Sequence, residues 1–286
     1  MICSNVRWID IVRWKIGRLG RSVAHPSDLM VCRFDPGKIE GDYIVWLGHA
    51  TFYLRLQSKG ILLDPIFGDI PFHKRLIPFP CDPKELDVDL ILISHGHFDH
   101  LDIPSLSMFD ASIVVPQGLG RYVKSKKVME LEWWQDIVIE GIKIRALPAK
   151  HWHQRGLFDK NAAFWCSFLI DGIYFAGDSA YYPHFKQIGS CHDIDIALLP
   201  IGAYEPRHIM KENHLSPEEA YEAFRDLKAS MFIPYHFGTF ILSDEPVDEP
   251  LRRIEAMAKR DERICILSPG SALVFQDRAV GGVGDE

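Results

Sequence analysis

The feature that most constrains this chain is a short apolar run followed at once by a cluster of metal-binding side chain types. Leu90–Ile93 has the composition of a buried strand, and residues 94–100 read Ser-His-Gly-His-Phe-Asp-His. Imidazole is a good ligand for zinc, iron or copper, and carboxylate suits the same hydrolytic metals. Three imidazoles and one carboxylate within six residues are improbable in an ordinary polar surface loop. We therefore expect a metal site directly after a buried strand.

The spacing within this cluster indicates two metal positions. His95 and His97 are two residues apart, so on an extended or turning backbone they can point the same way and hold one metal. Asp99 and His100 turn the other way and can serve a second. One cluster does not fill two metal sites, so further ligands should follow other strands downstream.

Three further candidates follow strand-like runs in this way. They are His151 in Pro-Ala-Lys-His-Trp-His, Asp178 at the end of Ile-Tyr-Phe-Ala-Gly-Asp, and His236 at the end of Met-Phe-Ile-Pro-Tyr-His. Each alone is ambiguous, because a single histidine after a strand is more often hydrogen-bonded structure than a ligand. Their recurrence in one context favours metal binding, with the Asp178 carboxylate able to bridge two metals. His153 competes with His151, and spacing alone does not separate them.

The rest of the pattern predicts a layered α/β domain. Ten short runs have the β-branched or aromatic composition of strands: Tyr43–Leu47, Thr51–Leu56, Ile61–Leu63, Leu90–Ile93, Ser112–Val115, Ile142–Ala146, Phe164–Ile170, Ile173–Phe175, Ile196–Leu199 and Met231–Ile233. Helices are expected late in the chain. Ser216 begins a capping box that leads into an apolar stripe, and Pro250 opens a second helix.

Composition narrows the class of protein. The formal net charge of −7 argues against general nucleic-acid binding, which needs clustered positive charge. No run approaches the roughly 18 to 20 apolar residues of a membrane-spanning helix, and charges interrupt the N-terminus where a signal peptide would be apolar. The six cysteines form no CxxC pair. We expect a cytoplasmic protein with reduced cysteines.

The N-terminal segment differs in charge from the rest of the chain. Residues 1–25 carry five basic side chains and one acidic side chain, a net of +4, which leaves −11 for the remainder. On a helix their apolar side chains share one face. That face could touch anionic lipid, which would place the protein peripherally at the inner side of a membrane, or it could pack on the domain; packing is favoured. We expect an N-terminal extension over 1–40, a hydrolase domain over 41–277 and a tail over 278–286.

Several blocks of sequence resemble a known family. They are Trp46–Leu54, Ile61–Phe67, Ile93–Asp102, Pro148–Trp152, Phe175–Phe185, Pro200–Ala220 and His236–Phe240. The His-Gly-His-Phe-Asp-His signature and the order of candidate ligands resemble the metallo-β-lactamase superfamily. The blocks together are similar to its N-acyl-phosphatidylethanolamine phospholipase D group. Gly96 and Phe98 depart from the Asn and Tyr usual in the animal enzymes, but neither is a ligand position.

The resemblance implies a four-layer αββα sandwich with metals at one edge of the sheets. It implies two zinc ions per chain, with Mn²⁺ and Fe²⁺ as alternatives, and it favours His151 over His153. The implied ligands of one ion are His95, His97 and His151; those of the other are Asp99, His100 and His236, with Asp178 bridging. Asp99 and His214 are expected in the catalytic site, His214 as a non-ligand facing the substrate. Asp64 and His49 are expected to support the site or form turns, while Glu205 and Arg207 either form an ion pair or line the groove.

The resemblance also implies a reaction. Two zinc ions would lower the pKa of a bound water from 15.7 toward roughly 7, supplying hydroxide to attack a small-molecule or lipid phosphodiester. A lactonase similar to ascorbate-6-phosphate lactonase is an alternative, and a non-catalytic metal-binding protein is another. The sequence leaves the oligomeric state open, with a homodimer among the alternatives.

Overall fold

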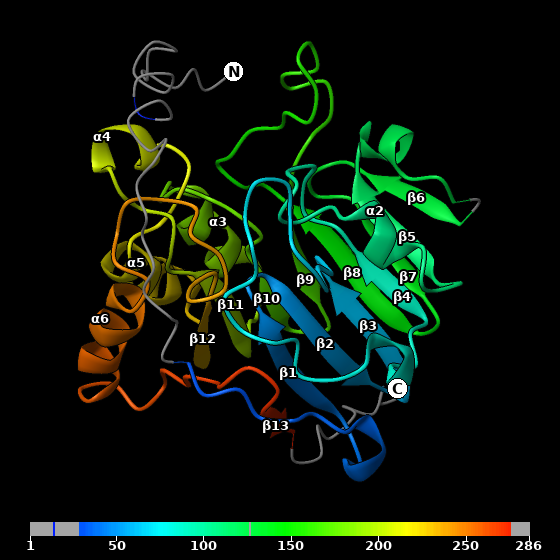
Figure 1. The fold of residues 1–286 in the computed structure, drawn as a ribbon, viewed down its shortest axis with the longest axis horizontal. Coiled ribbons are helices and arrows are strands. Elements are labelled where there is room, and N and C mark those ends of the chain that lie inside the picture. The colour runs from blue at the N-terminus through cyan, green and yellow to red at the C-terminus, as the bar shows by residue number, and fades with distance from the viewer. Residues whose placement is uncertain (1–13, 15–28, 126, 276–286) are drawn as a thin grey trace, which may run out of the picture.

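The strands form two sheets that pack face to face (Figure 1). The computed structural model describes residues 14, 29–125 and 127–275. The seven-stranded sheet has the order β13 (Ala272–Val274), β1 (Tyr43–Gly48), β2 (Thr51–Leu56), β3 (Lys59–Leu63), β4 (Leu90–Leu92), β5 (Ser112–Pro116) and β6 (Val128–Leu131). The six-stranded sheet has the order β12 (Met231–Tyr235), β11 (Ile196–Pro200), β10 (Ile173–Phe175), β9 (Ser167–Ile170), β8 (Ile142–Leu147) and β7 (Asp136–Ile139).

Side chains that alternate along the strands of the first sheet contribute to hydrophobic cores on both of its faces. In β1, Ile44 and Trp46 face the second sheet, whereas Tyr43, Val45 and Leu47 belong to the cluster on the other face of the first sheet. Successive side chains of a strand point to opposite faces, so a strand that is apolar throughout is buried on both. All six residues of β1 are buried. This double burial explains why the central strands read as continuous apolar runs.

Helices cover the outer faces, completing the αββα arrangement (Figure 1). The α-helices are α2 (Ile103–Leu106), α3 (His184–Cys191), α4 (Arg207–Met210), α5 (Pro217–Leu227) and α6 (Glu249–Ala258). The 3₁₀ helices are η1 (Pro36–Lys38), η2 (Pro83–Glu85) and η3 (Leu119–Tyr122). α5 packs against both α3 and β11. The predicted capping box is present, because Ser216 Oγ accepts from the Glu219 N–H while the Glu219 carboxylate accepts from the Ser216 N–H.

The parallel strands direct several loops to one edge of the sandwich. β3, β4, β5 and β6 are parallel neighbours in the first sheet, as are β10, β11 and β12 in the second. The carboxyl ends of parallel strands lie at the same edge of a sheet, so the residues that follow them are brought together. The Cys166 N–H donates to the Ser94 carbonyl and the His236 N–H to the His49 carbonyl, which ties the two sheets together at this edge.

The structure corrects some sequence-based boundaries. The run expected as a strand from Phe164 begins only at Ser167, because Phe164 and Cys166 bond to the loops at Gln117 and Ser94 instead. The strands β6, β7 and β13 and the helix α3 were not expected; β6 and β7 are partly exposed and carry charged residues, so their sequences lack a clear strand pattern.

The N-terminal extension and the tail remain predictions, since most of their residues lie outside the described ranges. Trp14 is described, and its indole N–H donates to Asp244 Oδ2 at 2.7 Å. No described helix combines the length and the apolar character needed to cross a bilayer.

Candidate metal centre

Three imidazoles from two loops form a tight triangle. His95 and His97 follow β4, and His151 follows β8 on the other sheet. His97 Nδ1 lies 2.9 Å from His95 Nε2 and 3.1 Å from His151 Nε2. The three nitrogens therefore surround one small space, as the ligands of a tetrahedral metal ion do.

Hydrogen bonds behind the triangle fix how two of these rings point. His151 Nδ1 lies 3.0 Å from the Asn213 carbonyl oxygen, which can only accept, so Nδ1 carries the proton and Nε2 presents a lone pair toward His97. His95 Nδ1 lies 3.0 Å from Ser94 Oγ. Such partners orient the rings of metal-binding histidines.

A second group lies beside the first. Asp99 and His100 end the His-rich loop, and His236 follows β12. Asp99 Oδ2 lies 3.6 Å from His100 Nε2 and 3.7 Å from His236 Nε2. His49, from the turn between β1 and β2, places its Nε2 3.0 Å from the same oxygen. These four residues form one of the groups close enough to hold a cation.

Asp178 lies between the two groups. Its Oδ2 is 3.3 Å from His100 Nε2 and 3.8 Å from His151 Nε2, and its Oδ1 is 3.2 Å from His236 Nε2. One carboxylate thus reaches histidines of both groups, which is the geometry that a bridging ligand requires. The predicted seven residues are all brought to one place by the fold.

Asp64 supports the second group from behind. It follows β3, is fully buried, and its Oδ2 accepts from His100 Nδ1 at 2.6 Å. Its other contacts are with Ser94, whose N–H and O–H both donate to the carboxylate. This contact directs His100 Nε2 toward Asp178, as in the carboxylate–histidine pairs of zinc sites.

Three residues of the centre have an unusual backbone conformation. His49, Asp64 and His236 have φ values of 54°, 40° and 67°, a left-handed conformation that is uncommon for residues other than glycine. Each directly follows a strand. Strain of this kind persists only where the surroundings hold it, and it clusters at functional sites.

The chemistry of the donors fits divalent metal ions. His100 Nε2, His236 Nε2 and Asp178 Oδ1 are buried and have no hydrogen-bond partner among the described residues. Buried polar atoms are normally paired, because an unpaired one costs roughly 1–3 kcal/mol. A set of orphaned nitrogens and carboxylate oxygens that converge on shared spaces is explained by cations that complete them.

The charges of these groups depend strongly on one another. Burial and neighbouring imidazoles hold the pKa of His95 well below its usual range, and burial does the same for His151. Burial opposes protonation of His236, but Asp178 and Asp99 outweigh it and raise its pKa to about 9. Burial opposes ionisation of Asp178, but His236 and His100 hold its pKa well below normal. The carboxylates of the site are therefore ionised, and protonated histidine lies beside them. A bound metal cation could supply this positive charge instead of the proton.

Comparison with known proteins agrees with this geometry. The profile described as the Beta-lactamase superfamily domain matches residues 59–237, more than half of the chain. The chain belongs to the β-lactamase superfamily of metal-dependent hydrolases.

Individual relatives extend this result. The chain is 35% identical, over 76% of its length, to a mitochondrial N-acyl-phosphatidylethanolamine-hydrolyzing phospholipase D of Saccharomyces cerevisiae, and it spans 52% of that relative. It is 30% identical to a metal-dependent hydrolase of Methanosarcina barkeri, covering 82% of this chain and 98% of the relative. The solved metallo hydrolase Igni18 of Ignicoccus hospitalis shares the fold, with a TM-score of 0.62, 19% identity, and coverage of 83% of this chain and 99% of that one.

The structure also shows where His214, Glu205 and Arg207 lie, the other residues singled out from the sequence. His214 lies at the metal centre, with Nδ1 3.6 Å from Asp178 Oδ2 and no hydrogen-bond partner. Arg207 pairs with Glu219 at 2.6 Å rather than with Glu205, whose carboxylate accepts from the Arg207 N–H. These contacts favour a structural role for Glu205 and Arg207 over lining of the groove. The ion pair of Arg207 is made with Glu219, however, and not with Glu205 as considered from the sequence.

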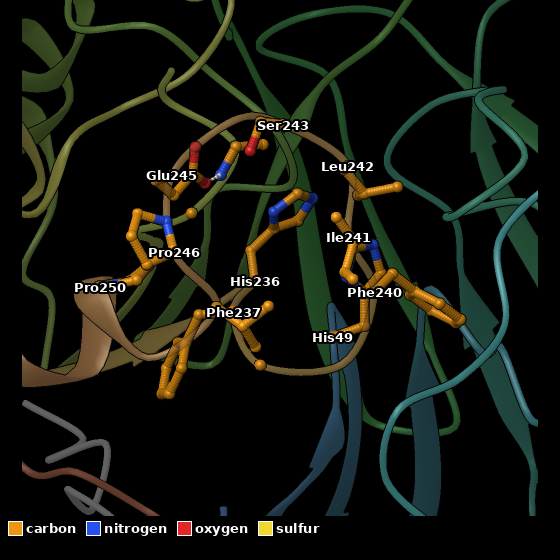
Figure 2. A pocket seen from close by; sticks show the side chains of 14 residues that line it. His49, His236, Phe237, Phe240, Ile241, Leu242, Ser243, Glu245, Pro246 and Pro250 are labelled. Carbon is orange, nitrogen blue, oxygen red and sulfur yellow. Dashed lines mark hydrogen bonds between the residues drawn. The ribbon is translucent and has the colours of Figure 1, made fainter. Parts of the chain in front are cut away.

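The centre is partly open to solvent at His97, Asp99 and His214. The side chains of Asp99 and His214 are 16% and 13% exposed, whereas His100, Asp178 and His236 are almost completely buried. On the far side, Figure 2 shows a cavity next to His236 and His49 that is lined by the loop 236–250. Its volume is about 20 Å³, which suits a single water molecule and not a phosphodiester. The partly exposed residues His97, Asp99 and His214 mark the open side of the centre.

Three residues that support the centre were not predicted from the sequence. Ser94 and Asn213 orient ligand rings, and only the position of Ser94 directly before His95 gave any signal. Arg155 was not noticed at all; its guanidinium donates to the Gly96 carbonyl at 3.0 Å. Backbone contacts of this kind leave no pattern in a sequence.

Proposed function

We propose that this protein is a zinc-dependent hydrolase with a dinuclear centre that cleaves phosphodiesters of the kind found in phospholipids. The observation that carries the proposal is the position of Asp178 between two groups of converging ligands. In this proposal His95, His97 and His151 hold one ion. Asp99, His100 and His236 hold the other, and Asp178 is shared.

The bound ions would supply Lewis acidity and activate water at neutral pH. The protein's own part is orientation. Asn213 and Asp64 hold His151 and His100 in the required tautomers, and His49 holds Asp99. Fixed dipoles and charges of this kind stabilise charge that develops during reaction without having to reorganise.

His214 is the group proposed to contact the substrate. Burial lowers its pKa to about 4, so its ring is neutral at pH 7 and can donate one hydrogen bond through one nitrogen. Its Nδ1 is buried beside Asp178 without a hydrogen-bond partner, while the side chain as a whole is 13% exposed. A phosphoryl oxygen or a leaving oxygen beside Asp178 would be within its reach.

The proposed substrate class is supported by relatives and by sequence. The yeast relative is named as hydrolyzing N-acyl-phosphatidylethanolamine. The long block Pro200–Ala220, which contains His214, is part of the resemblance to that group. Because this chain spans about half of the yeast relative, its substrate requires direct measurement.

The test is a substrate panel with a matched variant. Purified protein is given an aryl phosphodiester, N-acyl-phosphatidylethanolamine in detergent and a set of lactones, and metal content is measured by mass spectrometry. We expect phosphodiester turnover and about two zinc ions per chain. Turnover of lactones alone would overturn the phosphodiesterase assignment. Reconstitution with Mn²⁺ and Fe²⁺ would show whether zinc is the preferred metal.

His97→Ala is the decisive variant, and His208→Ala is its control, because His208 is exposed on α4 outside the centre. We expect His97→Ala to lose metal and activity and His208→Ala to keep both. Fewer than one metal per chain in the native protein, with folding unchanged by His97→Ala, would contradict the hydrolase proposal. Stoichiometric metal without turnover of any substrate would favour a non-catalytic metal-binding protein.

A further inference from the structure

The tip of the loop between β8 and β9 carries two large apolar side chains that no described residue covers. Leu157 is 86% exposed and Phe158 is 99% exposed. The loop projects beyond the sheets, green at the top of Figure 1. Fully burying one such side chain is worth about 1.5–3 kcal/mol, so exposing two in sequence is costly unless something covers them.

The tip is held rigidly in this exposed arrangement. The Asp159 carboxylate accepts from the N–H of Arg155 at 3.0 Å, from the N–H of Gly156 at 2.7 Å and from the Tyr122 hydroxyl at 2.8 Å. A side chain that bonds neighbouring backbone groups in this way fixes a turn. The turn therefore presents Leu157 and Phe158 outward rather than letting them fold back onto the domain.

The same loop is joined to the open side of the metal centre. The Trp152 ring packs 4.6 Å from that of His97. Arg155 donates to the Gly96 carbonyl, and its guanidinium lies 4.3 Å from the centre of the partly exposed Phe98 ring. Whatever covers the tip is consequently held beside the entrance to the site.

The surroundings of the tip are basic, in contrast to the chain as a whole. The neighbouring segment 121–124 reads Arg-Tyr-Val-Lys and contains no acidic residue. Its Tyr122 is bonded to Asp159, which places the segment next to the tip. Lys160 adds a further exposed charge, with its ammonium 5.9 Å from the Trp152 ring centre. Apolar tips flanked by lysine and arginine are typical of proteins that dock on anionic lipid surfaces.

We propose that this tip, residues 156–158, inserts into the surface of an anionic phospholipid bilayer, with Arg121, Lys124 and Lys160 facing the headgroups. The site is separate from residues 1–25. Docking would bring the open side of the metal centre against the lipid surface. The proposal does not depend on which bond the enzyme cleaves.

The test is vesicle binding by the full, metal-loaded chain, with the vesicle lipids analysed for hydrolysis after sedimentation. Vesicles of phosphatidylcholine alone and of phosphatidylcholine mixed with phosphatidylglycerol are sedimented with wild type and with Leu157→Ser/Phe158→Ser. We expect the double variant to bind mixed vesicles at least tenfold more weakly, in line with the apolar surface removed. Met30→Ser is the control, since Met30 is 72% exposed and is not part of the loop between β8 and β9, and it should bind as wild type does.

A second variant tests the charges. Lys124→Gln/Lys160→Gln should lose the preference for mixed vesicles and keep the weaker binding to phosphatidylcholine; an unchanged preference would contradict the role of the basic groups. Absence of vesicle binding by wild type, or equal binding by the serine variant, would overturn the proposal. So would a dimeric wild type that becomes monomeric in the serine variant, since the tip would then be a contact between copies. Circular dichroism and turnover of a soluble aryl phosphodiester check that the variants are folded.

Discussion

Asp64 Oδ2 lies 2.6 Å from His100 Nδ1, and both side chains are fully buried. The carboxylate leaves His100 no choice of tautomer, since only Nδ1–H can donate to it. This relationship links the end of β3 to a proposed zinc ligand that follows β4.

Asp64→Asn should weaken zinc binding without removing any ligand. The new amide presents an N–H or a weaker acceptor to His100 and no longer enforces the tautomer, so we expect about a ten- to hundredfold loss of affinity at the second position. Competition with a chromophoric chelator measures this loss. Asp89→Asn is the control, because Asp89 also accepts a buried backbone N–H, that of Gly60, but lies far from the centre. Equal affinities in the two variants would refute the role of Asp64.

Loss of His49 should weaken binding of the ion held by Asp99, His100 and His236 more than binding of the other ion. It donates to Asp99 Oδ2 at 3.0 Å, and its own backbone is fixed by Thr239 and His236. Removing the donor in His49→Ala frees the Asp99 carboxylate to rotate, so we expect one zinc to be lost at chelator concentrations that leave the other bound. His49→Gln, which retains an N–H donor, should recover part of the affinity. Simultaneous loss of both ions would count against this assignment.

Glycine is required at position 96 because a neighbouring side chain occupies the space that a Cβ atom would need. A Cβ atom at this position would lie 2.2 Å from Cε1 of His153. Gly96→Ala should therefore destabilise the protein by about 1–3 kcal/mol through overpacking, measured by urea unfolding. In a double-mutant cycle with His153→Ala, the two changes should cost less together than the sum of their separate effects. Strict additivity would show that the two residues do not compete for space.

His184 gives a pH dependence away from the metal centre. Burial and, less strongly, the charge of Lys150 lower its pKa to about 3, so the folded state holds it neutral while the unfolded chain binds a proton below about 6.5. The unfolded state then binds more protons, and stability falls as the pH drops through this range. Between pH 7 and pH 5 we expect wild type to lose about 2 kcal/mol more than His184→Gln, from the free energy of about 1.4 kcal/mol per pKa unit. Urea midpoints at the two values test it, and parallel losses would contradict it.

The elements that could be predicted from the sequence depend on contacts between residues close together in the chain. The helix at Ser216 depends on contacts three residues apart, and the His-rich loop depends on a strand that is apolar because both its faces are covered. The edge strands β6 and β7 could not be recognised in the same way. Val128–Leu131 and Asp136–Ile139 are half exposed and charged, and their strand conformation depends on pairing with β5 and β8.

The metal-binding chemistry could be predicted from the chain alone, since short motifs contain the candidate ligands in order. Which nitrogens converge, which oxygens they share and where the centre is open could be seen only in the folded structure. Those relations join ends of strands from two sheets, and distances between such loops depend on how the sheets pack. The exposed tip at Leu157 and Phe158 illustrates the same limit. In the sequence both residues look like ordinary apolar side chains, and only the packing shows that no described part of the chain covers them.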